Sequence, residues 1–273
     1  VAPYAIDANP FMAHVRTEML PQGTKTHSFS RITKDTALSG TITEGTGLSN
    51  TAFDTINVDA SVAEVGIMRQ FTKFGERTNM LATDGLHAAA ITDGAAMCLE
   101  RFETDLWAEA SNATTTVSNT GAAFTIASFA GALSQHTVNK SKGRVVFMLS
   151  ATQAKNLRAE LASSGATWLS NGSGNRVLEQ VDASGYMGNL MGADVFTNNL
   201  AESSGGDKLG LAMIDGGGAN PENCATAASL GWLPEVASLP NVAFSGGLQL
   251  AITMAYGIIE VLDYAYVGLV SIA

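Results

Sequence analysis

The side chains that usually carry enzyme chemistry are few in this chain and are scattered along it. The four histidines lie at positions 14, 27, 87 and 136, and the two cysteines at 98 and 224, so neither type has metal or redox spacing. Glu100, Glu103 and Asp105 cannot all face one way on a helix and are interpreted as part of a solvated face. Asp215 and the three glycines after it are interpreted as a turn, because no lysine follows closely. The sequence therefore predicts no catalytic residue, no metal site and no cofactor.

The composition favours an assembly over a solitary enzyme. Of 273 residues, 46% are apolar and only 15% are charged, which is below the roughly 25% typical of soluble domains. The net charge of −10 argues against general nucleic-acid binding. The apolar run over 248–259 is too short to span a bilayer, and no signal peptide is expected at the N-terminus. Cys98 and Cys224 are expected to be buried, reduced thiols, which fits synthesis in the cytosol.

The elements before residue 76 are expected to be extended. Residues 1–24 carry three of the six prolines and predict an arm that is disordered or lies along a partner. Residues 25–75 are rich in threonine, serine and glycine and predict a long β-hairpin with its tip at 44–50. The apolar positions change parity after Val62, which predicts a bulge. Because such a hairpin cannot pack a core alone, we expect it to lie on another subunit or to be floppy.

A long helix is predicted over 78–111. Its apolar positions recur every seven residues, and two further leucines strengthen the same stripe. The stripe comprises Leu81, Ala88, Ala95, Leu99, Phe102 and Leu106. Gly85 and Gly94 weaken the prediction, because glycine is a poor helix former.

The remaining elements alternate irregularly between helix and strand. Helices are predicted over 125–138 and from a Ser150 cap to residue 162. Strands are predicted over 144–149, 195–196, 209–214, 248–258 and 261–270, and the strand over 248–258 alternates strictly. The absence of a regular strand–helix rhythm favours an α+β fold over a doubly wound parallel sheet.

The order of these elements resembles the HK97-fold major capsid proteins of tailed double-stranded DNA bacteriophages. The segment Arg144-Val-Val-Phe-Met-Leu-Ser-Ala-Thr-Gln-Ala-Lys-Asn-Leu-Arg158 is similar to that family's strand followed by a short helix. The segment Gly188-Asn-Leu-Met-Gly192-Ala-Asp-Val-Phe196 is similar to its glycine-punctuated turn and strand. Asp194 stands where the family often has proline. The resemblance covers nearly the whole chain and rests on the order of these motifs.

The resemblance implies a division of the chain into four parts. These are an N-terminal arm (1–24), an E-loop (25–75), a peripheral domain (76–139 and 243–273, with spine helix 78–111) and an axial domain (140–242). Contacts with neighbouring subunits are implied for Arg31, Lys34, Thr41, Glu44, Leu48, Phe53, Ile56 and Val58 in the E-loop and for Tyr4, Phe11 and Arg16 in the arm. Packing of the spine helix is expected at Leu81, Leu99, Phe102 and Leu106.

The resemblance also implies a structural role without enzymatic activity. Copies would form hexamers and pentamers of an icosahedral virion capsid around double-stranded DNA, which is not bound sequence-specifically. Further partners would be scaffolding, portal and decoration proteins, with assembly in the host bacterial cytoplasm and no membrane contact. An encapsulin-type nanocompartment shell is the alternative with the same fold. A secreted β-rich adhesin or lectin, which the long helix fits poorly, and an unrecognised hydrolase are alternatives of other classes.

Overall fold

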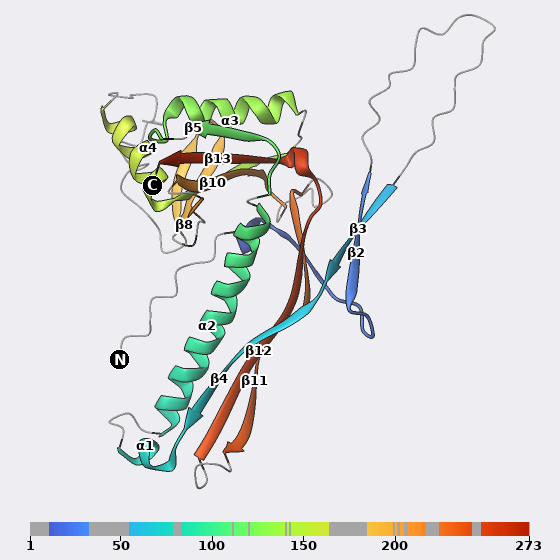
Figure 1. Cartoon of the computed structure of the whole chain (residues 1–273), viewed down its shortest axis with the longest axis vertical. Coiled ribbons are helices and arrows are strands. Elements are labelled where there is room, and N and C mark those ends of the chain that lie inside the picture. The colour runs from blue at the N-terminus through green and yellow to red at the C-terminus, as the bar shows by residue number, and fades with distance from the viewer. Residues whose placement is uncertain are drawn as a thin grey trace, which may run out of the picture.

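The computed structural model describes residues 11–32, 55–78, 83–110, 112–119, 121–139, 141, 143–163, 185–198, 200, 203–204, 207–216, 224–241 and 247–272. These residues form a long sheet lined by one helix, a compact body of sheet and helices above it, and a hairpin that projects to one side (Figure 1). The mixture of helices with mixed sheets confirms the α+β prediction.

The long sheet has four strands in the order β1 (Arg16–Met19), β11 (Thr226–Asn241), β12 (Gly247–Glu260) and β4 (Ala63–Phe71). β1 runs parallel to the start of β11, and the other neighbours are antiparallel. Helix α1 (Lys73–Thr78) precedes helix α2 (Thr83–Ala110), which runs along one face of this sheet (Figure 1). The long helix predicted from the sequence is thus confirmed for its described residues.

Helix α2 contacts the sheet through a row of buried residues four positions apart, which comprises Gly94, Cys98, Phe102 and Leu106. Glu103 and Trp107 are also buried. Ala88, which the seven-residue pattern includes, is exposed instead. Leu99 is half-buried against the core and Leu81 lies outside the described residues. The buried residues form an i, i+4 row, which is inclined to the helix axis, so a seven-residue repeat does not follow it.

Strand β12 confirms the predicted alternation. Leu250, Ile252, Met254 and Tyr256 are all buried on the face of the sheet that α2 covers. The Tyr256 ring meets the Phe102 ring edge-on, with the centroids 4.7 Å apart.

The body contains a seven-stranded sheet with two helices on one face. The strand order is β5 (Thr116–Asn119), β13 (Tyr266–Ile272), β10 (Asp207–Ile214), β6 (Val145–Ser150), β8 (Ala193–Asn198) and β7 (Tyr186–Leu190), with β9 (Ser203–Ser204) beside β10. Helices α3 (Ile126–Val138) and α4 (Ala151–Ser163) pack on this sheet. Two 3-10 turns, η1 (Met12–His14) and η5 (Asp263–Ala265), complete the described elements. None of the helices in this described part of the chain is long and apolar enough to cross a membrane.

The starts of α3 and α4 follow from capping side chains. Thr125 Oγ1 accepts a hydrogen bond from the Ser128 amide at 3.2 Å, and Ser150 Oγ accepts one from the Gln153 amide at 3.3 Å. Gln153 Oε1 in turn accepts a hydrogen bond from the Ser150 amide at 3.2 Å, and these two reciprocal bonds form a capping box. Its Nε2 also donates to the carbonyl oxygens of Lys208 and Leu269, each at 3.1 Å. One buried amide therefore ties α4 to β10 and β13.

The structure divides the chain at points other than the expected domain boundaries. β11 lies beside β12 in the long sheet, so residues 226–241 belong with α2 and not with the body. Conversely, α3, β5 and β13 belong to the body and not with α2. The chain crosses between the two parts after α2, after β10 and after β12.

The projecting hairpin is shorter than expected. β2 (Thr26–Ile32) pairs with β3 (Thr55–Ser61), while the next strand, β4, pairs with β12 in the long sheet. The change of parity therefore marks Val62, where the chain leaves one sheet for another, and not a bulge within one strand. The expected tip at 44–50 lies outside the described residues.

Candidate assembly surfaces

The base of the hairpin is packed on its own subunit. The register places His27, Phe29, Arg31 and Val58 on one face, and Phe29 is almost fully buried in the main core. On the opposite side of this contact, Gly257 leaves no room for a side chain, because a Cβ there would run into the Ser61 backbone. The expectation that the whole hairpin lies on another subunit or is floppy is therefore wrong for its base.

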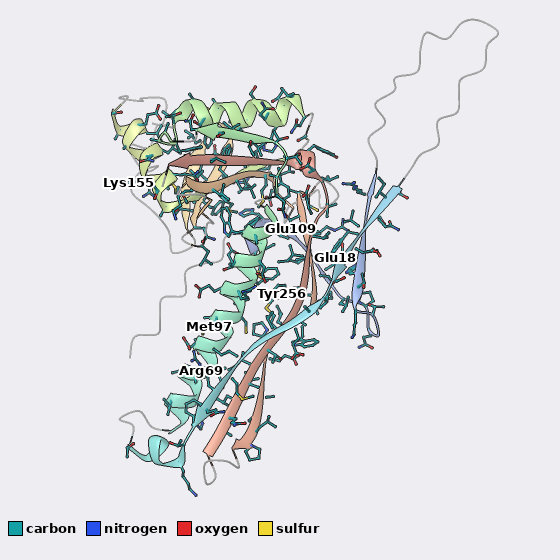
Figure 2. The ribbon with its side chains drawn as sticks, in the orientation of Figure 1. Glu18, Arg69, Met97, Glu109, Lys155 and Tyr256 are labelled. Carbon is teal, nitrogen blue, oxygen red and sulfur yellow. The ribbon has the colours of Figure 1, made fainter. Side chains whose placement is uncertain are left out.

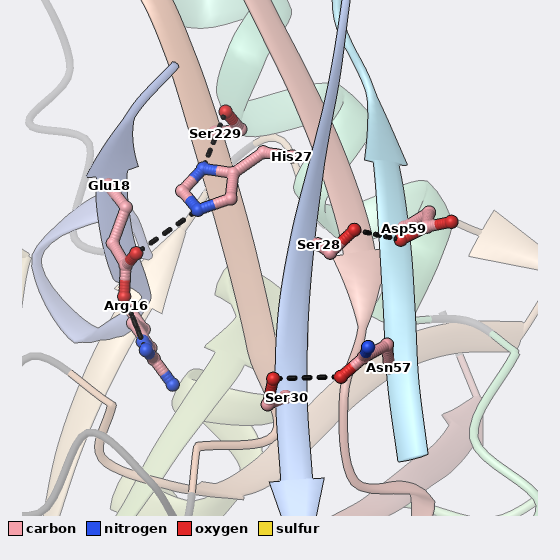
Figure 3. A network of polar contacts seen from close by, with 8 residues as sticks. All are labelled: Arg16, Glu18, His27, Ser28, Ser30, Asn57, Asp59 and Ser229. Carbon is pink, nitrogen blue, oxygen red and sulfur yellow. Dashed lines mark hydrogen bonds and ion pairs between the residues drawn. The ribbon is translucent and has the colours of Figure 1, made fainter. Parts of the chain in front are cut away.

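A polar network connects the base of the hairpin to β1 and β11 (Figure 3). His27 Nδ1 lies 3.2 Å from Ser229 Oγ, and His27 Nε2 lies 3.3 Å from Glu18 Oε2. Arg16 Nε donates to Glu18 Oε1 at 2.7 Å. The Arg16 guanidinium also lies over the Phe29 ring, 5.4 Å from its centroid. Arg16, expected to contact a neighbour, is thus engaged within its own subunit.

The other face of the hairpin is polar and exposed. Ser28 donates to Asp59 and Ser30 donates to the Asn57 side chain, both across the strand pair (Figure 3). Cross-strand pairs of this kind stabilise an isolated two-stranded ribbon. These pairs therefore hold β2 and β3 together on the face that the rest of the subunit does not cover.

The expected E-loop contacts divide into three groups. Arg31 Nη1 donates to the Val261 carbonyl oxygen at 2.7 Å in its own subunit. Val58 is half-buried, whereas Ile56 is 39% exposed although it lies on the apolar face. Ile56 is thus the described member of the set with the most surface to offer a neighbour. The remaining members, Lys34, Thr41, Glu44, Leu48 and Phe53, lie outside the described residues.

Arg31 approaches a group of carboxylates where the long sheet meets the body. Burial, together with the nearby carboxylates of Asp263 and Glu109, raises the pKa of Glu260 to about 7, while Arg31 acts in the opposite direction. The Glu260 amide donates to Glu109 Oε1 at 3.2 Å, and Asp263 accepts from the Thr114 amide at 3.2 Å. Within the described residues no group of three or more acidic, histidine or cysteine side chains could hold a metal ion.

The N-terminal segment is also held by its own subunit. Phe11 is fully buried, and its ring meets Trp107 of α2 edge-on with the centroids 5.3 Å apart. Phe11 therefore has no surface for the expected contact with a neighbour. Tyr4 lies outside the described residues. Cys98 and Cys224 are buried and unbonded, as predicted.

Glu103 is the residue for which the sequence interpretation fails most clearly. It was expected on a solvated face, yet it is 0% exposed beneath the N-terminal segment. Its Oε1 accepts from the Phe11 amide at 3.0 Å and from Asn198 Nδ2 at 2.6 Å, and its Oε2 accepts from the Met12 amide at 3.2 Å. Burial raises the pKa of Glu103 to about 7, against the effect of these three donors. The sequence does contain a sign of this burial, because Glu103 lies four residues from both Leu99 and Trp107 and so shares their face of the helix.

One face of the long sheet is covered by none of the described helices. Arg69 pairs with Asp93 of α2, so Met68, the residue before it in β4, points to the opposite face. Met68 is 52% exposed, and Leu239 of β11, which lies on the same face, is 50% exposed. We call this surface of β4, β12 and β11 the open sheet face. Beyond Leu230, β11 also has no described strand on its outer edge.

Exposed apolar residues on an open sheet face are typical of interaction surfaces. The projecting hairpin supplies a second surface that one subunit alone does not cover (Figure 2). The arrangement is suited to contacts between copies.

Comparison with known proteins identifies the fold through structure and not through sequence. No family model and no curated protein matches the sequence. The chain is similar to the acidic stable capsid structure of Helicobacter pylori bacteriophage KHP30, with a TM-score of 0.69 and 12% identity over 95% of this chain and 88% of that one. It is similar to a structure of Mycobacterium phage Che8, with a TM-score of 0.63 and 18% identity over 90% and 84%. It is also similar to the holo-SrpI encapsulin complex from Synechococcus elongatus, with a TM-score of 0.66 and 11% identity over 97% of this chain and 87% of that one.

Proposed function

We propose that this chain, which has the HK97-type capsid fold, is a major capsid protein that self-assembles into hexamers and pentamers of an icosahedral phage head. The observation that carries the proposal is the similarity to phage capsid structures over 90% or more of the chain. The open sheet face, with exposed Met68 and Leu239, and the projecting hairpin supply surfaces for such assembly. The role is structural and not enzymatic.

The central contact between subunits is the hairpin of one copy on the open sheet face of the next. Ile56 supports this proposal, because it stays exposed on the apolar side of the hairpin. Met68 and Leu239 supply apolar surface of the kind that an interface core needs. The E-loop residues beyond Ile32, from Lys34 to Phe53, extend this contact.

The proposed shell encloses double-stranded DNA without reading its sequence. The net charge of −10 supports weak contact with DNA, because tight binding requires a basic surface. The protein works in the virion capsid after assembly in the host bacterial cytoplasm. Scaffolding, portal and decoration proteins are its further partners.

The proposal is tested by electron microscopy of particles formed by the purified chain. Met68→Lys places a charge on the open sheet face and should reduce the yield of closed particles at least tenfold. Val138→Lys, at a 68% exposed position on α3 of the body, is the matched control and should assemble like the parent. Uniform monomers of the parent chain at every concentration, or unimpaired assembly of Met68→Lys, would contradict the proposal.

Deletion of residues 40–52 tests the hairpin separately. The deletion should leave the circular dichroism of the subunit unchanged and abolish or weaken assembly. An unfolded deletion variant would instead place these residues in the subunit core.

A second candidate is an encapsulin-type shell around a protein cargo, favoured by the similarity to the SrpI encapsulin structure. Particles isolated from the native source decide between the two. Nuclease-protected genomic DNA inside them supports the phage head, whereas a co-purifying enzyme without DNA supports the nanocompartment.

A further inference from the structure

Residues Phe11–Met19, which we call the strap, lie across the junction between α2 and the body. The Phe11 ring contacts Trp107, and the His14 carbonyl oxygen accepts from the Gly216 amide at 2.8 Å. At its far end the strap forms β1 and pairs with β11. These contacts join three separate parts of the chain, so the position of the strap depends on all of them.

The carboxyl group of Glu103 lies directly under the strap. Two of its three hydrogen-bond donors, the amides of Phe11 and Met12, belong to the strap itself. The third, the Asn198 side chain, comes from β8 and is also buried. All three donors are neutral, so the described contacts of Glu103 include no cation.

The charged groups on the packed elements are engaged elsewhere. In the strap, His14 Nδ1 lies 3.1 Å from Asp215 Oδ1 at the end of β10, and Arg16 pairs with Glu18. On β8, Asp194 pairs with Arg144, and on α2, Arg101 pairs with Asp105. These interactions leave Glu103 as a buried carboxyl group without an ionic partner.

An ionised carboxylate in such a place is costly, because burial removes water without supplying an opposite charge. Lifting the strap would return water to the carboxylate and relieve this cost. We propose that the strap is a proton-linked closure over Glu103, in which protonation of Glu103 favours the closed strap and ionisation favours its release.

The expected pH dependence of strap closure follows from the shift in the pKa of Glu103. Burial raises the pKa of Glu103 from its ordinary value of 4.5 to about 7 when the strap is closed. The closed form then binds the proton more tightly than the open form, so closure weakens as the pH rises. Between pH 6 and pH 8 the equilibrium constant for closure should fall about tenfold.

Hydrogen–deuterium exchange of the purified full-length chain measures this closure. The readout is the protection of amides 11–20, corrected for the intrinsic pH dependence of exchange. The parent chain should lose about tenfold protection in this segment from pH 6 to pH 8. Glu103→Gln cannot ionise and should show no such change. Glu100→Gln, an exposed position on the same helix, is the matched control and should behave like the parent.

Two further variants separate Glu103 from its surroundings. His14→Gln removes the histidine of the strap and should retain the pH dependence. Asn198→Ala removes a donor that favours the ionised form, so the midpoint should move upward by roughly half a pH unit or more. This variant also tests the proposal if Glu103→Gln does not fold.

The proposal is overturned if protection of residues 11–20 in the parent chain is independent of pH. It is equally overturned if His14→Gln abolishes the dependence while Glu103→Gln keeps it, or if Asn198→Ala leaves the midpoint unchanged. None of these outcomes bears on whether the chain forms a shell, since exchange is measured on the unassembled subunit.

Discussion

The seating of α2 on the long sheet can be tested with one pair of substitutions in the same helix. A Cβ added at Gly85 would meet no atom within 4 Å, whereas one at Gly94 would lie 2.7 Å from Ile252 Cδ1. Replacing glycine by alanine inside a helix stabilises it by about 1 kcal/mol in both cases. Only Gly94→Ala must also displace a buried side chain.

The magnitude follows from this difference. Overpacking a core costs about 1–3 kcal/mol, so Gly85→Ala should gain about 1 kcal/mol of unfolding free energy. Gly94→Ala should range from no change to a loss of about 2 kcal/mol. The difference between the two alanine variants isolates the close approach of α2 to β12, because the helix propensity term is common to both.

A double-mutant cycle assigns the cost to Ile252. Ile252→Val removes the Cδ1 atom nearest to the new Cβ, and alone it should cost about 0.5–1.5 kcal/mol. In the Gly94→Ala background it should cost less or be favourable, because it relieves the overlap. Urea unfolding of the subunit followed by circular dichroism supplies the four free energies. Equal stabilities of Gly85→Ala and Gly94→Ala, or zero coupling with Ile252→Val, would refute the close packing.

Three further predictions concern buried contacts. Phe11→Ala should destabilise the subunit by about 3–5 kcal/mol in urea unfolding, whereas Met19→Ala, at an exposed position, should have little effect. Gln153→Ala should cost about 2–3 kcal/mol in the same assay, because it leaves the Ser150 amide and two carbonyl oxygens without their partner. The raised pKa values of Glu103 and Glu260 mean that the folded chain retains protons that the unfolded chain releases above about pH 4.5. The unfolding free energy should therefore fall between pH 5 and pH 7, and a constant or rising value would contradict these assignments.

The elements that the sequence predicts best are those specified by local signals. Ser150 caps a helix where it is expected to, the helix predicted over 125–138 is α3, and the strict alternation over 248–258 corresponds to β12. The order of arm, hairpin, helix and α+β body led to the correct fold although each motif is weak. Local capping and periodicity depend on neighbours in the chain, so a single sequence contains them.

β11 escapes prediction because it does not have one environment along its length. Its first residues are buried on both sides, whereas Leu233, Val236 and Leu239 are exposed on an edge. Pro234 lies at the register shift between Trp232 and Glu235, where a missing amide donor is tolerated. A strand that changes from buried to edge shows neither alternation nor a continuous apolar run.

The candidate contact residues were harder to predict, because their contacts come from distant parts of the chain. Phe11, Arg16 and Arg31 lie on segments that read as projecting arms, yet each finds its partner in its own subunit. Glu103 reads as a surface residue until the strap covers it. The burial of these side chains depends on tertiary contacts, which composition and residue spacing do not reveal.

The single residue between β3 and β4 has a mechanical consequence. Because Val62 alone joins them, a pull on the outer end of β3 is passed directly into β4 along the line that both strands follow in Figure 1. β4 is paired with β12 from Ala63 to Phe71, so such a load is shared by the whole ladder in shear and does not open it one bond at a time. The hairpin therefore behaves as a tether anchored in the stiffest direction of the sheet, and tension between neighbouring subunits would reach α2 before it could detach the hairpin.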